Sequence, residues 1–205
     1  MAARGAGTDR AITRRMRRIK LAVSAMALFG MAACNNNSPV TPSTGTTLNV
    51  VLTDSPFSDA QAVLVTFSAV SVHMSSGAFT TLPFADGASS RTCDLKKLQG
   101  ANDVLGTGTL PPGHYTEIRL AVASAAIYFD NVASGSACAS SIAAPAGRAA
   151  AVTIPSGDVR LNRPFDVINS TTTTITLDFD GDQSLTHTGS DQYVMHPVIG
   201  VVSVQ

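Results

Sequence analysis

The sequence predicts an all-β fold in which residues 47–205 form a single β-sandwich domain. From Leu48 onward, apolar side chains recur at every second position, which is the pattern of strands that bury one face. The apolar runs are short and are separated by glycine, proline, aspartate and asparagine, as in sandwiches and barrels. No window of twelve or more residues in this part shows the 3.6-residue period of an amphipathic helix.

The first two expected strands show the alternation most clearly. The apolar positions of the first strand are Leu48, Val50 and Leu52. This strand ends at Asp54, and we expect its side chain to make a hydrogen bond in the turn before Pro56. The second strand keeps one phase up to Phe67 and is then one residue out of phase. That slip predicts a β-bulge near Ser68 and Ala69.

The remaining strands follow at short intervals. They are expected at Phe79–Leu82, 116–122, 126–129, 151–154, Phe165–Val167, 174–179 and 194–204. Residues 94–98 fit either a strand or a single helical turn, and residues 133–150 fit an inserted surface loop. Pro197 lies inside the last apolar run, so this strand is expected at a sheet edge or with a bulge.

Residues 1–33 are predicted to be a signal peptide. A cluster of arginines precedes residues 21–33, a mostly apolar run of thirteen residues. This run is too short to cross about 30 Å of hydrocarbon, which takes about twenty helical residues, and it is typical of a secretory signal. Met16 is an alternative start, because the residues that follow it form a compact signal peptide by themselves.

Cys34 is the predicted site of lipid attachment. It follows Met31-Ala32-Ala33, and small residues directly before a cysteine form the pattern at which a lipoprotein signal is cut. Residues 34–46 would then be a lipidated, flexible tether, since this polar segment cannot bury enough surface to fold. We therefore expect an exported protein, anchored by its lipid to the bacterial outer membrane and facing the periplasm or the cell surface. Asn35, where an inner-membrane signal commonly has Asp, weakly favours the outer membrane.

The charge of the predicted mature chain argues against nucleic acid as a partner. Seven of the fourteen basic residues precede Cys34, whereas thirteen of the fourteen acidic residues follow it. The mature part thus has a net charge of minus six, and phosphate neutralisation needs clustered Lys and Arg. The expected partners are the membrane, through the lipid, and a protein or glycan. The sequence does not identify this protein or glycan, and it does not indicate the oligomeric state.

Cys93 and Cys138 are a candidate disulfide. They are the two cysteines left after Cys34 is assigned to the lipid, and an oxidising compartment favours their pairing. Two unpaired thiols remain the alternative, and a metal site from two cysteines without a nearby histidine is less favoured.

Several segments together resemble one protein family. They are 52–56, 65–67 with 72–73, 94–98, 110–120, 154–157, 177–180 and 197–199, in the family's order. On these segments the chain resembles the domain of unknown function 4382 family (DUF4382), found mainly in exported bacterial and archaeal lipoproteins. The turn before Tyr115 is also similar to turns of transthyretin-like sandwiches. The resemblance implies an immunoglobulin-like or transthyretin-like sandwich and brings no established activity.

Three aspartates are a candidate metal site. Asp178, Asp180 and Asp182 surround a glycine turn at the end of a strand, and oxygen clusters suit calcium. The spacing of a full calcium loop is absent, so carboxylates on a solvated strand face are the alternative. Apart from calcium, no cofactor is expected.

The sequence favours binding over catalysis. None of the four histidines stands in a metal spacing, and no nucleophile or phosphate-binding motif is present. Tyr128 and Phe129 are the best candidates for stacking on a sugar ring. We expect a non-enzymatic envelope module that binds or builds structure. The alternatives are calcium- or carbohydrate-dependent adhesion and, less favoured, a periplasmic hydrolase.

Overall fold

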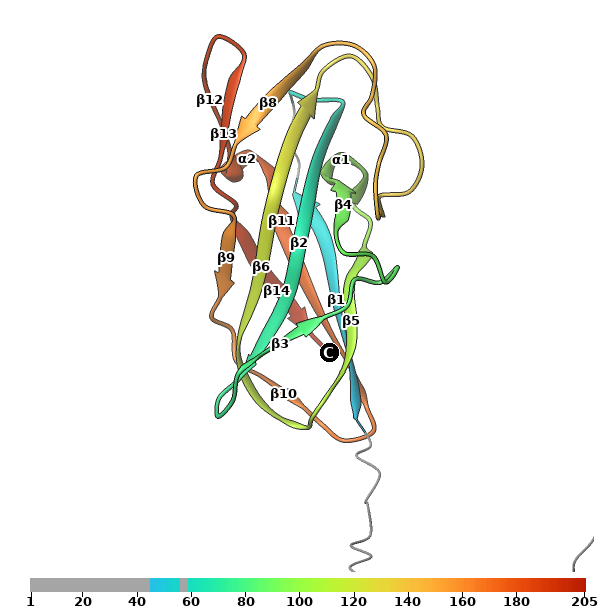
Figure 1. The fold of residues 1–205 in the computed structure, drawn as a ribbon, viewed down its shortest axis with the longest axis vertical. Helices are drawn as coiled ribbons and strands as arrows, with labels where there is room; N and C mark the ends of the chain where they lie inside the picture. Colours follow the sequence, from blue (N-terminus) through green and yellow to red (C-terminus); the bar gives the residue numbers. More distant parts are fainter. Residues whose placement is uncertain (1–44, 56–58) are drawn as a thin grey trace, which may run out of the picture. The chain divides into compact units, whose positions relative to one another are not determined.

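The structure consists of two β-sheets packed against each other (Figure 1). It is a computed structural model that describes residues 45–55 and 59–205. The strands are β1 (Thr46–Ser55), β2 (Ala62–Met74), β3 (Phe79–Leu82), β4 (Arg91–Asp94), β5 (Asp103–Leu110), β6 (Gly113–Tyr128), β7 (Cys138–Ala139), β8 (Ala149–Thr153), β9 (Asp158–Leu161), β10 (Phe165–Val167), β11 (Thr172–Asp180), β12 (Leu185–Gly189), β13 (Gln192–Met195) and β14 (Ile199–Val204). The helices are α1 (Leu95–Leu98) and α2 (Gly181–Ser184). The predicted all-β sandwich is confirmed.

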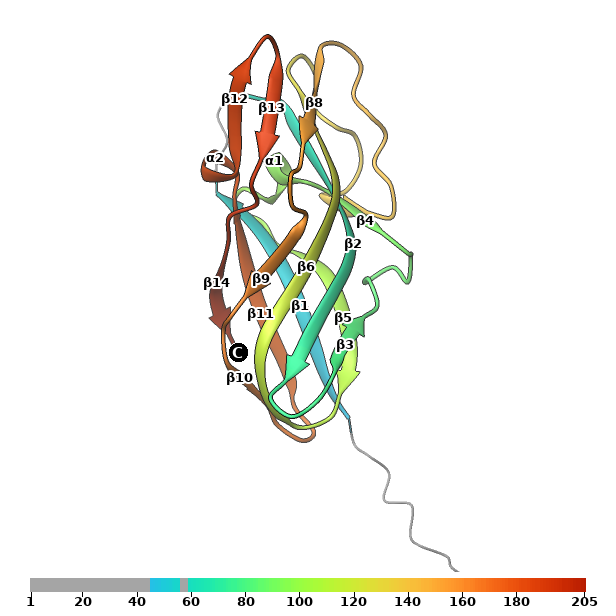
Figure 2. The same cartoon turned by 60° about the vertical axis from the view of Figure 1, so that its left-hand side comes forward.

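The smaller sheet contains both the first and the last strand of the domain. Its strand order is β14-β11-β1-β5. β1 pairs in parallel with β11, from Thr47 opposite Thr172 to Ser55 opposite Asp180, and antiparallel with β5. The two central strands, β1 and β11, thus lie side by side although most of the domain separates them in sequence (Figure 2).

The larger sheet is built on a long antiparallel pair, β2 and β6. Its main order is β12-β13-β8-β6-β2-β4-β7, with β9 and β10 also on β6 and β3 also on β2. The β2–β6 ladder runs from Ala62 opposite Tyr128 to Met74 opposite Tyr115. β2 and β6 are the centre of this sheet, and the shorter strands β3, β4, β8, β9 and β10 all pair with one of them.

The core lies between the two sheets. Leu48, Val50 and Leu52 of β1 are fully buried, as the alternating pattern predicts. They pack in one cluster with side chains from the opposite sheet, such as Phe67 and Ile118. Burial of large apolar side chains contributes about 1.5 to 3 kcal/mol each, so this cluster is the main source of stability.

Bulges explain how the predicted strands differ from the observed ones. In β2, Phe67 faces Val122 and Ala69 faces Ala121, so Ser68 is the extra residue and the predicted bulge is confirmed. A second bulge lies at Ala123 of β6. The shift it causes in the apolar phase is why the sequence predicted two strands, 116–122 and 126–129, where there is one.

The prediction of one C-terminal strand is wrong in extent. Residues 194–204 are divided between β13 and β14, which end and begin on either side of Pro197. The proline lacks the N–H that a continuous ladder needs. β14 then moves to the edge of the smaller sheet, which is the position expected for a strand next to proline.

The leader, Cys34 and nearly all of the tether lie outside the described residues, so these predictions are not tested by the fold. Within the described part of the chain, no helix is long and apolar enough to cross a membrane.

Candidate binding site

A pocket of about 240 Å³ lies on the outer face of the larger sheet. Its walls come from β2, β4, β6 and the segment between β6 and β8, residues 129–148, which we call the β6–β8 loop. The lining residues are Leu64, Thr66, Thr92, Ser124, Ala125, Ala126, Tyr128, Ser141 and Ile142. Because four of them carry an aliphatic hydroxyl, we call this site the hydroxyl pocket.

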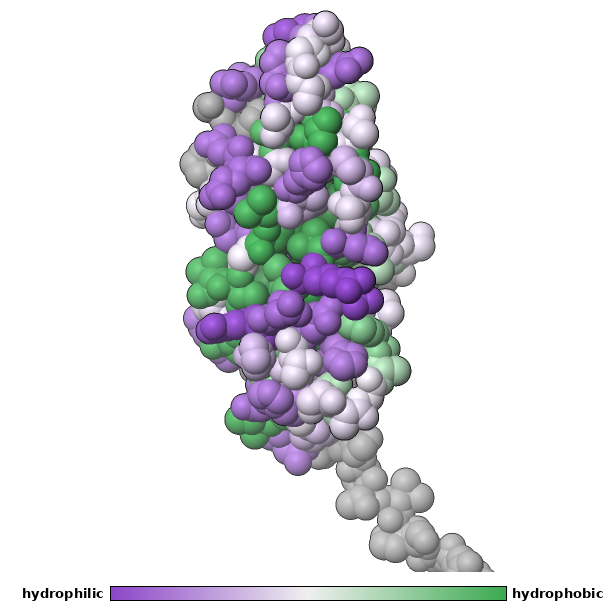
Figure 3. Space-filling view, turned by 90° about the vertical axis from the view of Figure 1, so that its left-hand side faces the viewer, coloured by the Kyte–Doolittle hydropathy of each residue, from purple (hydrophilic) through white to green (hydrophobic). Residues whose placement is uncertain are grey.

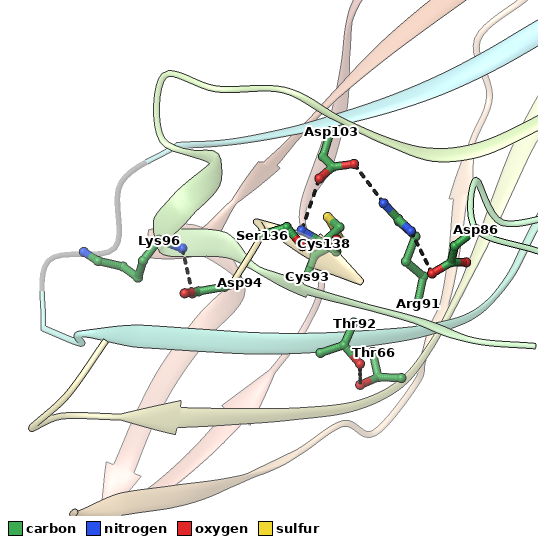
Figure 4. The surroundings of a disulfide bond; sticks show 10 residues. All are labelled: Thr66, Asp86, Arg91, Thr92, Cys93, Asp94, Lys96, Asp103, Ser136 and Cys138. Atoms are coloured by element: carbon green, nitrogen blue, oxygen red, sulfur yellow. Dashed lines mark hydrogen bonds and ion pairs between the residues drawn. A yellow bond between two sulfur atoms is a disulfide. The ribbon is translucent and has the colours of Figure 1, made fainter. Parts of the chain in front are cut away.

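The alternation of the strands places these hydroxyls together. Thr66 of β2 faces Thr92 of β4 on one side and Ser124 of β6 on the other. The side-chain oxygens of Thr66 and Thr92 lie 2.9 Å apart and share a hydrogen bond (Figure 4). A hydroxyl has one donor and two acceptor positions, so this pair keeps hydrogen-bonding capacity for a ligand.

The disulfide fixes the β6–β8 loop over the sheet. Cys93 and Cys138 are bonded, which confirms the predicted pairing, and their Cα atoms lie 4.1 Å apart. They face each other where the short strand β7 pairs with β4 (Figure 4). Ser141 and Ile142 follow Cys138 by three and four residues, so the cross-link determines where this wall of the pocket stands.

Polar contacts hold the same part of the loop. The main-chain N–H of Cys138 donates to Asp103, at 3.2 Å, and the other oxygen of Asp103 pairs with Arg91 at 2.9 Å (Figure 4). Arg91 also pairs with Asp86 at 2.9 Å, and its side chain is almost entirely buried. Arg91 thus holds Asp103 in place, and the second oxygen of Asp103 anchors the loop at the main chain of Cys138.

The two ends of the loop are tied to each other. The N–H of Arg148 donates to the carboxylate of Asp130, and the side chain of Asn131 donates to the carbonyl of Ala146 at 3.0 Å. Gly147 has a φ of 101°, and a Cβ atom there would overlap Asp130. Glycine is therefore required for the close approach of the two loop ends.

The hydroxyl pocket suits a neutral, hydroxyl-rich ligand. None of its lining residues is His, Cys, Asp, Glu, Lys or Arg. It offers hydrogen-bond donors and acceptors on the sheet, an aromatic side chain at Tyr128 and an apolar wall at Ile142. This combination can orient a sugar, whereas acid–base chemistry needs groups that titrate near the working pH.

The structure separates the two aromatic residues that the sequence placed together. Tyr128 is half-buried beside the small outer cluster of Ala62, Leu64 and Ala133 and lines the pocket. Phe129 packs instead against the main core, near Tyr193, with the guanidinium of Arg148 over its ring at 4.3 Å. Tyr128 is the last residue of β6 and Phe129 follows it, and consecutive residues of an extended chain point to opposite sides, so the pair forms no common stacking platform.

The three candidate calcium ligands mostly have structural partners. Asp178 accepts a hydrogen bond from Ser55 at 2.7 Å, and Asp180 caps α2 by accepting from the N–H of Gln183 at 2.9 Å. Asp182 is exposed in α2. Among residues 45–55 and 59–205, no three His, Cys, Asp or Glu side chains are grouped to hold a metal ion. Calcium binding stays a prediction without a ligand set.

Asp54 has an unusual environment near these aspartates. Only 6% of the residue is exposed, and neither carboxylate oxygen has a well-aligned hydrogen-bond partner among residues 45–55 and 59–205; the side chain of Gln99 is the polar group that most opposes the effect of its burial. Burial raises the pKa of Asp54 to about 8, with Asp178 and Asp180 contributing and with Gln99 and Lys96 opposing. The predicted turn hydrogen bond to Asp54 is not found from any described residue; residues 56–58 are outside the description.

Sequence reasoning missed most of the pocket. It singled out Tyr128 but not Thr66, Thr92, Ser124 or Ser141, which come from four separate segments. The available signal was that Thr66 lies between inward-facing Val65 and Phe67, which places its hydroxyl on the outer face. Which hydroxyls become neighbours depends on strand order.

Comparison with known proteins gives a family but no relative of known activity. The family model described as Domain of unknown function (DUF4382) matches residues 45–197. No curated protein and no solved structure matches the chain. A proposal about function must therefore be built on the geometry of the sites in this molecule.

Proposed function

This chain belongs to the DUF4382 family, and on that premise we propose that it is a non-enzymatic binding module of the cell envelope. In this proposal a lipid on Cys34 anchors the chain in the outer membrane, and the hydroxyl pocket binds a carbohydrate. The single observation that carries it is a pocket whose polar groups are neutral hydroxyls, beside one aromatic ring. A rigid sheet with a functional loop on top is a common arrangement for recognition.

Three features favour carbohydrate binding over the alternatives. The lining residues of the pocket supply no carboxylate or imidazole for hydrolysis, which makes an enzyme less favourable. Sugar binding there also needs no calcium, so the carbohydrate-dependent form of adhesion is better supported than the calcium-dependent form. The cross-linked loop fixes one wall of the pocket before the ligand arrives, which lowers the entropic cost of binding.

Substitution of Tyr128 tests the sugar site. We expect Tyr128→Ala to weaken binding of a neutral oligosaccharide, identified on a glycan array, by about tenfold or more, since an aromatic contact and its buried area are lost. Thr92→Val keeps the shape but removes one hydroxyl of the Thr66–Thr92 pair, and a similar loss is expected. Affinity is measured by titration calorimetry.

The control for this test is Phe79→Ala. Phe79 is an exposed aromatic residue on β3 of the same sheet, outside the lining of the pocket. It is expected to leave the affinity unchanged. Equal losses in Phe79→Ala and Tyr128→Ala, or no glycan bound by the unaltered protein, would contradict the assignment.

Membrane anchoring is tested separately with Cys34→Ser. Without a thiol no lipid can be attached, so we expect the protein to move from the membrane fraction to the soluble fraction of lysed cells. The combined variant Cys93→Ala, Cys138→Ala serves as the control, because it removes the two disulfide-bonded cysteines but keeps Cys34. If Cys34→Ser protein still sediments with the membranes, the anchor is not this lipid.

A further inference from the structure

A second recess lies where the edges of the two sheets meet. It has a volume of about 300 Å³ and is lined by Arg160, Leu161, Asn162 and Arg163, from β9 and the segment after it, and by Val201 of β14. We call it the β9–β14 groove. Figure 3 shows a side of the molecule on which an apolar area lies directly beside strongly hydrophilic residues. A compact ligand with one charged end and one apolar face fits such a lining.

Within residues 45–55 and 59–205, the arginines of this groove have no carboxylate partner. Arg91, Arg119 and Arg148 form ion pairs with acidic side chains there, whereas Arg160 and Arg163 form none. The described domain has thirteen acidic and seven basic residues. Two unpaired arginines, three residues apart in an acidic domain, are therefore a local concentration of positive charge.

The register of the sheet adds a like charge at the same place. Arg160 of β9 lies directly opposite Arg119 of β6. Like charges directly opposite on neighbouring strands destabilise a sheet. Arg119 is compensated by Glu117, at 3.0 Å, whereas no acidic side chain in the described part of the chain pairs with Arg160. Asp158, two residues earlier on β9, forms no ion pair with either arginine in the described structure. An anion at Arg160 would relieve this repulsion.

We propose that the β9–β14 groove binds an organic oxyanion, namely the carboxylate or phosphate group of an acidic or phosphorylated sugar. Guanidinium groups are planar and present forked donors that match both anions in pairs of hydrogen bonds. The side-chain amide of Asn162 adds a neutral donor, and Leu161 and Val201 provide the apolar wall for the ring. This site is separate from the hydroxyl pocket, since the two share no lining residue.

Titration with four small probes tests the proposal. The purified protein is titrated with glucuronate, glucose 6-phosphate, glucose and inorganic phosphate, and the main-chain amide signal of Val201 is followed by NMR. We expect glucuronate or glucose 6-phosphate to shift this signal at lower concentration than glucose or phosphate. Whichever of the two binds more tightly identifies carboxylate or phosphate as the recognised group.

Two arginine variants locate the anion. Arg160→Gln and Arg163→Gln remove one charge each from exposed side chains, and each is expected to raise the Kd of the tighter probe by about tenfold. Arg148→Gln, which removes the same charge from an exposed arginine outside the groove, is the matched control and should not change it. The melting temperature of each variant reports whether the fold is retained.

Three results would overturn the proposal. The first is that glucose binds as tightly as glucuronate and glucose 6-phosphate. The second is that inorganic phosphate binds as tightly as the sugar probes. The third is that Arg148→Gln and Arg160→Gln lose the same affinity for the tighter probe. Because Tyr128→Ala does not alter the groove, these experiments fail or succeed independently of those on the hydroxyl pocket.

Discussion

Replacing both cysteines, Cys93→Ala with Cys138→Ala, is expected to lower the free energy of unfolding by about 4 kcal/mol. The bond closes a loop of 45 residues, and a cross-link of that length restricts the unfolded chain by about this amount in the chain-entropy model. Urea unfolding followed by circular dichroism measures the change. The unaltered protein in a reducing agent should unfold at the same urea concentration as the double variant.

The same double variant should weaken ligand binding at the hydroxyl pocket even where the domain is still folded. Ser141 and Ile142 are held over the sheet by the cross-link next to them, so its removal frees this wall and raises the entropic cost of binding. Binding in the β9–β14 groove should not change, which provides an internal control. Identical urea midpoints for the oxidised and reduced protein would contradict the stability prediction.

Asp54 is expected to make the protein less stable as the pH rises from about 4 to about 8. Its pKa is raised from 3.8 to about 8 in the folded protein, so between these values the folded state keeps a proton that the unfolded chain has lost. The free energy of unfolding is therefore highest below pH 4. It falls as the pH rises from 4 to 8, and above pH 8 Asp54 causes no further change. At about 1.4 kcal/mol per pKa unit, the upper limit is on the order of 6 kcal/mol.

Asp54→Asn should remove most of this pH dependence, because a neutral amide of similar shape cannot ionise. The variant is expected to be more stable than the unaltered protein at pH 8.5 and similar to it near pH 4. Burial also raises the pKa of Asp94, so a smaller slope of the same sign should remain. Asp182→Asn, at an exposed position, is the control, and urea unfolding at several pH values is the measurement. A variant with the same slope as the unaltered protein would rule out Asp54 as the cause.

Some of the architecture followed from neighbouring residues alone. The bulge at Ser68 could be predicted because a one-residue phase shift moves all later side chains of β2 to the other face. The Cys93–Cys138 pairing could be predicted because only one pairing remains once Cys34 is set aside. Five strands, β4, β5, β7, β9 and β12, were missed, since their short or glycine-rich segments show little alternation.

The sites depended on long-range contacts. Tyr128 and Phe129 are consecutive, yet the pleat sends one to the hydroxyl pocket and the other to the core. Asp54 looked like an ordinary turn residue, and its buried carboxylate follows from its place beside Asp178, Asp180 and Gln99. No spacing along the chain indicated that Arg160 would face Arg119.

The sequence by itself determined that this domain is a β-sandwich, because the two-residue period and the turn residues are local properties of the chain. It also determined the family and the cysteine pair. Only the tertiary structure decided which outward-facing residues became neighbours and which charges kept no partner. The physical reason is that strand order and register bring together segments such as β9 and β14, whose separation in the sequence says nothing about their distance in the sheets.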